Sequence, residues 1–212
     1  MPSPWEQAFP AVIDKENAVD LSTISREALV DELFAPNPCP HALQASRATC
    51  ARDPGGAIEP AREQRVRHIL AVAKELLLRD LQRDCRRQPV LDDPKDLCDW
   101  LRLRCAGLEH EIFLVVYLDT HLRLLDAEEI ARGTLTQTSV YPREVVKAAL
   151  AHNAAAVAFA HNHPSGSPEP SRADELLTTT LKSALALVDV RVVDHVVVAG
   201  AQTVSFAQRG LL

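Results

Sequence analysis

The sequence predicts an α+β fold, in which a mixed β-sheet is flanked by helices and preceded by a small helical region. Short apolar runs rich in β-branched residues recur after residue 110 and are typical of buried strands. Amphipathic stretches with helix-start residues lie between and before these runs. A chain of 212 residues accommodates one sizeable domain and a smaller one. We therefore place a helical region with a flexible proline-rich segment at 1–88 and the main domain at 89–212.

The N-terminal region is predicted to hold two helices joined by a linker. Residues 1–21 read as a loosely ordered tail. Apolar residues repeat on one face over 22–34, which indicates a helix. Residues 35–60 hold five prolines and a Gly-Gly pair, which predict a linker or loop. A long amphipathic helix follows over 61–87.

This second helix carries most of the positive charge of the region. Residues 61–88 hold eight basic and four acidic side chains, whereas the whole chain has a net charge of -6. One interpretation is a surface that contacts phosphates. The favoured interpretation is a solvated helix face whose arginines pair with nearby acids, because no aromatic residue interleaves for stacking on bases. The arginines concerned are Arg62, Arg65, Arg67, Arg79, Arg83, Arg86 and Arg87.

The main domain is predicted to mix helices and strands. A helix over 94–105 leads into a strand over 111–119, and residues 122–126 form its antiparallel neighbour after a turn. Pro142 suits the first helical position ahead of a helix over 143–152. Further strands are expected over 133–140, 154–160, 191–199 and 203–206, with a long helix over 171–187.

The composition excludes several classes of protein. A hydrophobic content of 47% and a charged content of 25% are those of a soluble globular protein. The five cysteines are odd in number and form no Cys-x-x-Cys pair, which indicates reduced thiols rather than disulfides or a zinc ribbon. No apolar run reaches membrane-spanning length, and the first residues do not form a signal peptide. We expect a cytoplasmic protein without a membrane partner, and the sequence does not define its oligomeric state.

One stretch, 161–174, combines residues that can hold a metal ion. His161 and His163 are separated by one residue, so their side chains point the same way on an extended strand. Prolines and a glycine then force a loop, and Ser171 opens a helix with Asp174 in its first turn. Two imidazoles and one carboxylate make a zinc site with a fourth position for water. The alternative is that Ser171 and Asp174 only cap the helix, which leaves both histidines unexplained.

These residues resemble a known family of metalloproteases. They fit the pattern His-x-His-Pro-x(6)-Ser-x-x-Asp of the JAMM (MPN+) metalloproteases at every fixed position. The run 161–166 also resembles the bacterial RadC proteins, named for DNA repair, and this resemblance covers roughly residues 90–212. It implies an MPN/JAMM-like (cytidine-deaminase-like) catalytic domain over 89–212. Three further segments match RadC in the same order along the chain: Gly133-Thr134, Tyr141-Pro142-Arg143-Glu144 and Asp194-His195.

The resemblance implies the chemistry of a zinc-dependent hydrolase. Zinc held by the two histidines and the aspartate would lower the pKa of a bound water to ~7, and a nearby carboxylate would take the proton. Glu111 is the chosen base, because JAMM enzymes place theirs at this kind of position upstream of the His-x-His. Glu109 shares a face with Glu111 on an extended strand, so only the match of Glu111-Ile112-Phe113 to the family favours Glu111. Glu144 is a weaker candidate, because a helix start already explains its charge.

Other residues of the motif have secondary assignments. The family gives Ser171 the role of donating a hydrogen bond to the oxyanion, while N-capping of the helix competes for the same hydroxyl. Asn162 points away from the two histidines and is assigned a structural role. His195 is favoured as a core histidine satisfied by hydrogen bonds over a partner of the metal ligands.

The leading functional hypothesis is a Zn2+ metallopeptidase that cleaves a peptide or isopeptide bond in a substrate the sequence does not name. The alternative is an accessory protein of DNA repair or recombination that binds nucleic acid, with the basic helix as its direct support. RadC proteins usually carry a DNA-binding helix-hairpin-helix, but residues 54–60 lack its Gly-x-Gly turn, so the hairpin is expected to be degraded or absent. A third hypothesis is a metal-stabilised interaction module without turnover.

Overall fold

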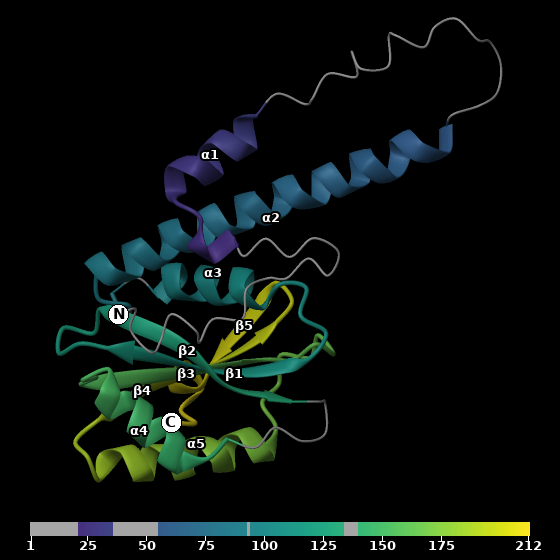
Figure 1. The fold of residues 1–212 in the computed structure, drawn as a ribbon. Coiled ribbons are helices and arrows are strands. Elements are labelled where there is room, and N and C mark those ends of the chain that lie inside the picture. Colours follow the sequence, from purple (N-terminus) through teal and green to yellow (C-terminus); the bar gives the residue numbers. More distant parts are fainter. Residues whose placement is uncertain (1–20, 36–54, 93, 134–139) are drawn as a thin grey trace, which may run out of the picture. The chain divides into compact units, whose positions relative to one another are not determined.

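The computed structural model describes residues 21–35, 55–92, 94–133 and 140–212 (Figure 1). The described chain forms two compact units that part between Leu77 and Leu78. The expected tail over 1–21 lies outside the described residues except for Leu21. Most of the expected strand over 133–140 lies outside them as well.

The smaller unit is helical. It contains the 3-10 turn η1 (Leu21–Thr23), α1 (Arg26–Phe34) and the first part of α2 (Gly55–Arg87). Ser25 caps α1 by accepting a hydrogen bond from the Ala28 amide at 3.2 Å. The predicted linker is wrong for residues 55–60, which are helical. A helix extends more easily than it nucleates, so the two glycines join its first turn rather than preceding it.

Four buried side chains hold the smaller unit together, with partly buried neighbours from both helices packed around them. This pairing of two amphipathic helices is what the periodic apolar residues predicted. The four buried residues are Leu21, Leu29, Val72 and Leu76.

The larger unit is built on a five-stranded mixed sheet with the strand order β2-β1-β3-β4-β5. Strand β1 pairs antiparallel with β2 and with β3, β3 pairs parallel with β4, and β4 pairs antiparallel with β5. The strands are β1 (Glu111–Leu118), β2 (Leu124–Gly133), β3 (Ala156–Asn162), β4 (Arg191–Ala199) and β5 (Gln202–Ser205). The predicted α+β class with a mixed sheet is confirmed.

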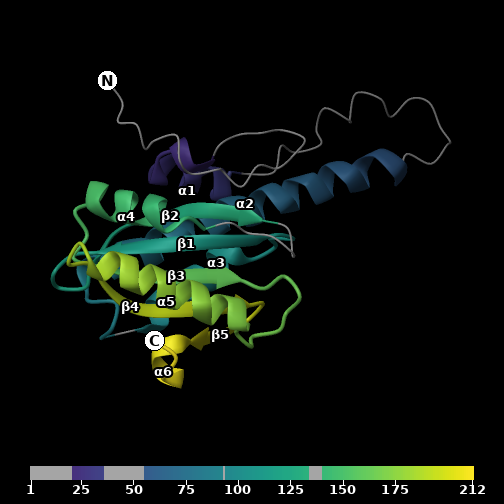
Figure 2. The ribbon, with the colours of Figure 1, turned by 90° about the horizontal axis from the view of Figure 1, so that it is seen from below.

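Helices cover both faces of this sheet (Figures 1 and 2). Helix α3 (Pro94–Cys105) lies on one face, where it packs with the end of α2. Helices α4 (Pro142–Ala151) and α5 (Arg172–Ala186) lie side by side on the other. A short helix, α6 (Phe206–Arg209), follows β5 and was not predicted. Among the described helices, none is both long and apolar enough to cross a membrane.

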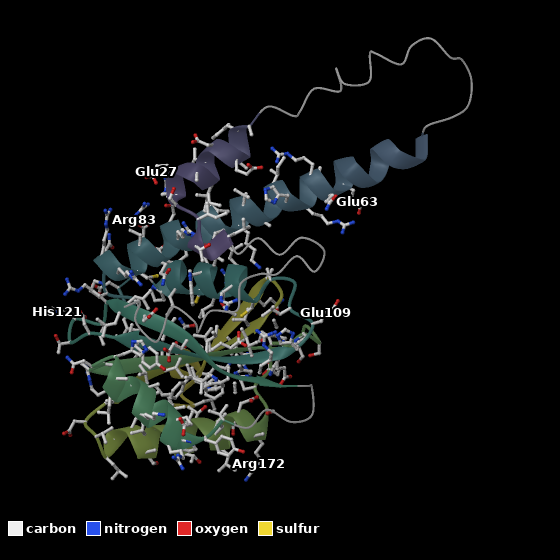
Figure 3. The ribbon with its side chains drawn as sticks, in the orientation of Figure 1. Glu27, Glu63, Arg83, Glu109, His121 and Arg172 are labelled. Carbon is white, nitrogen blue, oxygen red and sulfur yellow. The ribbon has the colours of Figure 1, made fainter. Side chains whose placement is uncertain are left out.

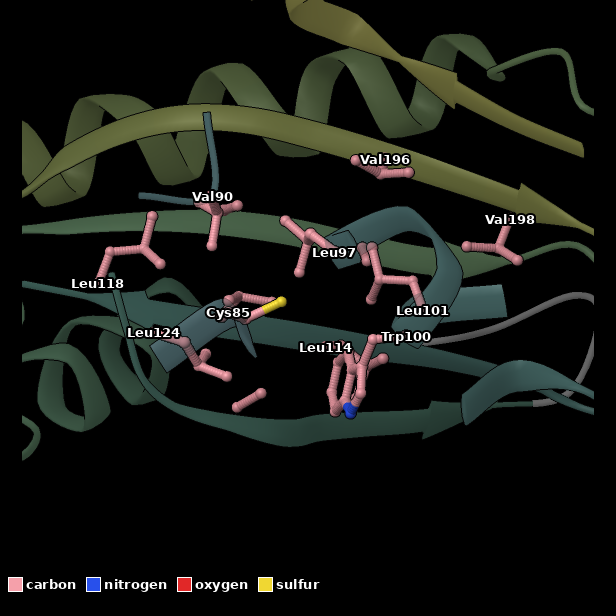
Figure 4. Close-up of a cluster of buried hydrophobic side chains, with 14 of the residues drawn as sticks. Cys85, Val90, Leu97, Trp100, Leu101, Leu114, Leu118, Leu124, Val196 and Val198 are labelled. Carbon is pink, nitrogen blue, oxygen red and sulfur yellow. The ribbon is translucent and has the colours of Figure 1, made fainter. Parts of the chain in front are cut away.

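Two apolar cores result from the alternation of β1 side chains between the faces of the sheet. Ile112, Leu114, Val116 and Leu118 pack toward α3, in the cluster drawn in Figure 4. Phe113, Val115 and Tyr117 pack toward α4 and α5. Every residue of β1 after Glu111 is therefore buried, which explains why the strand reads as a continuous apolar run.

Strand β2 is longer than the expected 122–126, because it continues through two glutamates to Gly133. The carboxylates of Glu128 and Glu129 both have partners within the fold. Glu128 accepts a hydrogen bond from the Tyr117 hydroxyl at 3.1 Å, and the His152 Nε2 atom lies 3.0 Å from it. Arg132 donates to Glu129 at 2.7 Å. Partners from neighbouring elements thus allow charged residues in a strand that local sequence alone does not favour.

Among the described residues, Cys85, Cys98 and Cys105 form no disulfide with one another, in agreement with the predicted reduced thiols. Cys39 and Cys50 lie outside the described residues.

Candidate metal centre

The candidate site lies where β3 ends and α5 begins. His161 is the last residue but one of β3, and His163 follows the strand directly. The His163 amide donates to the Val198 carbonyl of β4 at 2.8 Å. Gly166 then turns the chain with a φ of +79°, a conformation that costs glycine little. The Gly166 amide donates to the His163 carbonyl at 3.0 Å and closes this turn. The loop returns the chain to the sheet, where Ser171 caps α5.

The structure brings the three predicted metal ligands together. The Nε2 atoms of His161 and His163 lie 3.0 Å apart. The two Asp174 oxygens face them, with Oδ1 at 3.5 Å from His161 Nε2 and Oδ2 at 3.8 Å from His163 Nε2. One ligand atom from each residue can be chosen so that all lie within 4.8 Å of one another. A single ion can therefore contact two imidazoles and a carboxylate, which is the donor set of a catalytic zinc site.

The proton on His163 can be located from its other ring nitrogen. His163 Nδ1 lies 2.7 Å from the Ser167 carbonyl oxygen, which can only accept. Nδ1 therefore carries the proton, and in the neutral ring Nε2 presents its lone pair to His161 and Asp174. A ligating histidine commonly donates its second N–H to a backbone carbonyl in this way. The residues therefore fit a metal ion at this point.

The charge on Asp174 suits a ligand. Burial by itself raises the pKa of this carboxyl, but hydrogen bonding and the charge of His161, together with hydrogen bonds from Ser171, hold the pKa well below its ordinary value. The Ser171 amide and hydroxyl both donate to Asp174 Oδ2 at 2.7 Å. The carboxylate is thus ionised and oriented before any ion binds.

Ser171 also caps α5. Its Oγ accepts a hydrogen bond from the Asp174 amide at 3.2 Å, and the two residues form a reciprocal capping box. The capping bond uses a lone pair of Oγ, whereas the O–H points to the Asp174 carboxylate. The hydroxyl proton is thus not committed to the cap.

His195 lies against a metal ligand as well as in the core. It is fully buried, with the rings of Phe113, Phe159 and Phe206 around it at centroid distances of 4.6–5.8 Å. Its Nε2 atom is 2.8 Å from His161 Nδ1. Burial, followed by the charge of His161, lowers the pKa of His195 to about 3, so this ring is neutral at neutral pH.

The favoured assignment of His195, a satisfied core histidine, was therefore incomplete. The ring is satisfied by hydrogen bonds, and one of them reaches His161. No pattern in the sequence indicated this contact: the Thr178 hydroxyl lies 2.6 Å from His195 Nδ1 only because α5 packs against β4.

The position of Glu111 follows from strand register. Phe113 pairs with His161 across the antiparallel β1–β3 ladder, and residues opposite each other point to the same face. Glu111, two residues before Phe113, shares that face with the two histidines. Glu109 lies outside the strand, exposed in the bend before it (Figure 3). The parity argument therefore applies to Glu111 alone, and the choice of Glu111 as the base stays a prediction.

Glu144 is engaged elsewhere. It lies in the first turn of α4, where its carboxylate is 3.1 Å from Arg143 Nε and 3.6 Å from Lys147 Nζ. These contacts agree with the view that a helix start explains its charge.

Asn162 fastens the chain on both sides of Glu111. Its side-chain oxygen accepts from the Ile112 amide at 2.8 Å, and its amide nitrogen donates to the His110 carbonyl at 2.9 Å. These side-chain bonds replace the backbone pairing of β1 with β3, which ends at Phe113 and His161. The contacts match the structural role predicted for Asn162.

Arginines of α2 form ion pairs, as the favoured interpretation predicted. Arg65 pairs with Glu32 of α1, an acid outside the expected set. Arg67 Nη2 is 2.8 Å from Glu63, and Arg83 Nη1 is 3.0 Å from Asp80. Binding of nucleic acid by this helix stays a prediction.

Comparison with known proteins agrees with these features. A sequence model described as the RadC-like JAB domain matches residues 91–211. A UPF0758 protein from Leptothrix cholodnii is 52% identical over 165 residues, which cover 76% of this chain and 72% of that protein. UPF0758 proteins from Methylibium petroleiphilum and Dechloromonas aromatica are 60% and 58% identical, and each alignment covers 68% of this chain and 64% of the relative.

The matched region contains the five strands, the three candidate metal ligands, Glu111 and His195. It makes up more than half of the chain, and the relatives share over half of the aligned residues. The chain therefore belongs to the RadC-like JAB domain family.

Proposed function

We propose that the protein is a zinc-dependent hydrolase of the JAMM type, which cleaves a peptide or isopeptide bond. One observation carries this proposal: the Nε2 atoms of His161 and His163 face the ionised carboxylate of Asp174, and the proton of His163 is held on Nδ1. Three ligands leave coordination positions for water and substrate. A site used only to stabilise a fold is usually closed by a fourth protein ligand.

The chain supplies a base and an oxyanion donor beside the ligands. Zinc, when bound, supplies a Lewis acid that makes water nucleophilic at neutral pH. Glu111 accepts the proton of this water at its carboxylate and returns it to the leaving nitrogen. Its place on the ligand face of β1, secured by Asn162 on either side, supports this role.

Ser171 is proposed to stabilise the oxyanion. Its O–H turns from Asp174 Oδ2 to the developing charge, while its lone pair still accepts from the Asp174 amide. Capping and oxyanion binding thus use different parts of one hydroxyl. Loss of one such donor generally lowers kcat by about 10²–10³-fold.

Metal analysis of the purified protein is the first test. We expect about one zinc per chain, as for a single three-ligand site, and its loss in His161→Ala/His163→Ala and in Asp174→Ala. His121→Ala is the matched control, because His121 is exposed in the turn between β1 and β2. Absence of zinc from the wild type, even after zinc is supplied, would refute the proposal.

A panel of peptide and isopeptide substrates tests the chemistry. We expect Glu111→Gln to keep its zinc and to lose turnover by about 10²-fold or more, because the base is removed and the ligands are not. Glu109→Gln removes the neighbouring exposed acid and should leave turnover unchanged. Zinc binding by the wild type without turnover of any substrate would favour a metal-stabilised interaction module.

A further inference from the structure

A chain of hydrogen bonds connects two metal ligands through the interior of the protein. It runs from His161 Nδ1 to His195 Nε2 at 2.8 Å and from His195 Nδ1 to Thr178 Oγ1 at 2.6 Å. It ends where Thr178 Oγ1 donates to the Asp174 carbonyl at 2.6 Å. His161 and Asp174 thus lie at the two ends, and His195 and Thr178 form the relay between them.

The direction of every bond in this chain is determined by its last acceptor. The Asp174 carbonyl can only accept, so the single hydroxyl proton of Thr178 points to it. Thr178 Oγ1 then accepts from His195, which places the proton of His195 on Nδ1. A neutral His195 has a lone pair on Nε2, so His161 must donate from Nδ1. When His161 is neutral, as it must be to bind a metal ion, its Nε2 atom is then left with a lone pair facing His163 and Asp174.

The alternative arrangement would close the metal site. His161 Nε2 and His163 Nε2 are 3.0 Å apart, which is a hydrogen-bonding distance. The proton on His163 lies on Nδ1, so a proton on His161 Nε2 would be donated directly to His163 Nε2. That hydrogen bond would occupy both nitrogen ligands. The tautomer of His161 therefore decides between a metal site and a closed histidine pair.

We propose that His195 and Thr178 are positioning residues that hold His161 in the Nδ1–H tautomer and so keep the site open for a metal ion. The inference rests on the metal site of the proposed function but not on hydrolysis. Asp174 acts twice, as a ligand through its carboxylate and as the anchor of the relay through its carbonyl.

The surroundings of the relay keep its direction fixed. Thr178 is 1% exposed and His195 is 0% exposed, and aromatic rings border His195. Water therefore has little access to replace either partner. The relay also joins α5 to β3 through β4, so its polar atoms are held by three elements of secondary structure.

Two variants of Thr178 separate the relay from simple packing. Thr178→Val keeps the shape of the side chain but removes the acceptor for His195 Nδ1. Thr178→Ser keeps the hydroxyl but removes a methyl group, and it is the matched control for packing. We expect Thr178→Val to weaken zinc binding by about 10- to 100-fold, as for lost partners of metal ligands, and Thr178→Ser to bind nearly as the wild type. Competition with a chelator of known affinity measures both.

Nitrogen NMR of the histidine rings, in zinc-free protein well above the ordinary histidine pKa of about 6.5, gives a second measurement. We expect His161 to carry its proton on Nδ1 in the wild type and in Thr178→Ser, and on Nε2 to a large extent in Thr178→Val. The spectra also show whether each variant is folded. If Thr178→Val does not fold, the wild-type tautomer remains the deciding observation.

Two results would overturn the relay: zinc affinity of folded Thr178→Val equal to that of Thr178→Ser, or a wild-type His161 protonated on Nε2. The proposed function can fail separately. Zinc binding that depends on Thr178, without hydrolysis of any substrate, would support the relay and contradict the proposed hydrolase activity.

Discussion

At the scale of single residues, side chains within and just after β3 alternate between two tasks. His161 and His163 face the metal position, whereas Asn162 faces the other way and bonds to the backbone of β1. Asn162 is 4% exposed and makes one bond to each neighbour of Glu111. One extended tripeptide thus supplies two candidate ligands and holds the proposed base.

We expect Asn162→Ala to lower the free energy of unfolding by about 2–4 kcal/mol, because a buried amide and a carbonyl lose their partners. Zinc affinity should change little, since neither ligand is touched. Turnover should fall, because the backbone around Glu111 is released. Chemical denaturation, chelator competition and substrate assays measure the three quantities. Loss of zinc with unchanged stability would contradict this division of tasks.

The clustering of the three candidate metal ligands could be predicted from sequence, whereas the hydrogen bonds behind them could not. His161, His163 and Asp174 are close in the chain, and a strand, a loop and a helix start suffice to bring them together. The contact of His195 with His161 depends on the parallel pairing of β3 with β4, which local sequence does not specify. The family resemblance favoured Glu111 over Glu109, whereas an argument from the faces of the strand also required the point at which β1 begins.

At the scale of elements, the β1–β2 hairpin depends on one aspartate. Asp119 Oδ1 accepts from the amides of His121 and Arg123 at 2.8 and 2.9 Å, and Oδ2 accepts from Arg123 Nε at 2.9 Å. The turn also requires Leu122 to adopt a φ of +60°, which is unfavourable for a residue with a side chain. Asp119 thus offsets the cost of the turn that aligns β2 beside β1.

The contribution of Asp119 should depend on pH. Burial by itself raises the pKa of this carboxyl, but hydrogen bonds and the charge of Arg123, with a bond from His121, together hold the pKa below its ordinary 3.8. The folded state therefore binds the proton later than the unfolded state as the pH falls. The stability due to Asp119 is fully present above pH 3.8 and is lost as the pH falls through the lower folded pKa.

We expect Asp119→Asn to lower the free energy of unfolding by about 1–2 kcal/mol at neutral pH and to cost much less in acid. Denaturant titrations at several pH values, taken as the difference from wild type, measure this. Asp92→Asn is the control, because Asp92 is exposed before α3. A difference that stays constant through acid pH would show that the charge of Asp119 is not what stabilises the turn.

At the scale of the whole molecule, α2 contributes to two separate cores. Val72 and Leu76 belong to the core of the smaller unit, whereas Leu78 and Cys85 belong to the core between α3 and the sheet. The predicted boundary between residues 88 and 89 therefore leaves the last turns of α2 outside the main domain. A periodic apolar stripe does not reveal that it changes partners midway.

Two fragments test where the larger unit begins. We expect the fragment 78–212 to unfold cooperatively, and 89–212 to be less stable by at least about 3 kcal/mol, because Leu78 and Cys85 no longer cover the α3 core. Both contain all five strands of the sheet, so circular dichroism reports whether each fragment is folded. Equal stability of the two fragments would place the boundary at residue 89.

The nearness of the three ligands along the chain has a consequence for the unfolded protein. Residues 161–174 keep two imidazoles and a carboxylate within one short loop even without the sheet, so gathering them around an ion costs little chain entropy. The proposed zinc site therefore predicts weak zinc binding by the unfolded chain as well, which would subtract from the stabilisation that zinc gives the folded protein. His195 comes from further along the chain, so only folding adds its hydrogen bond to His161. The rise in unfolding temperature on adding zinc should thus be smaller than the rise calculated from the zinc affinity of the folded protein alone.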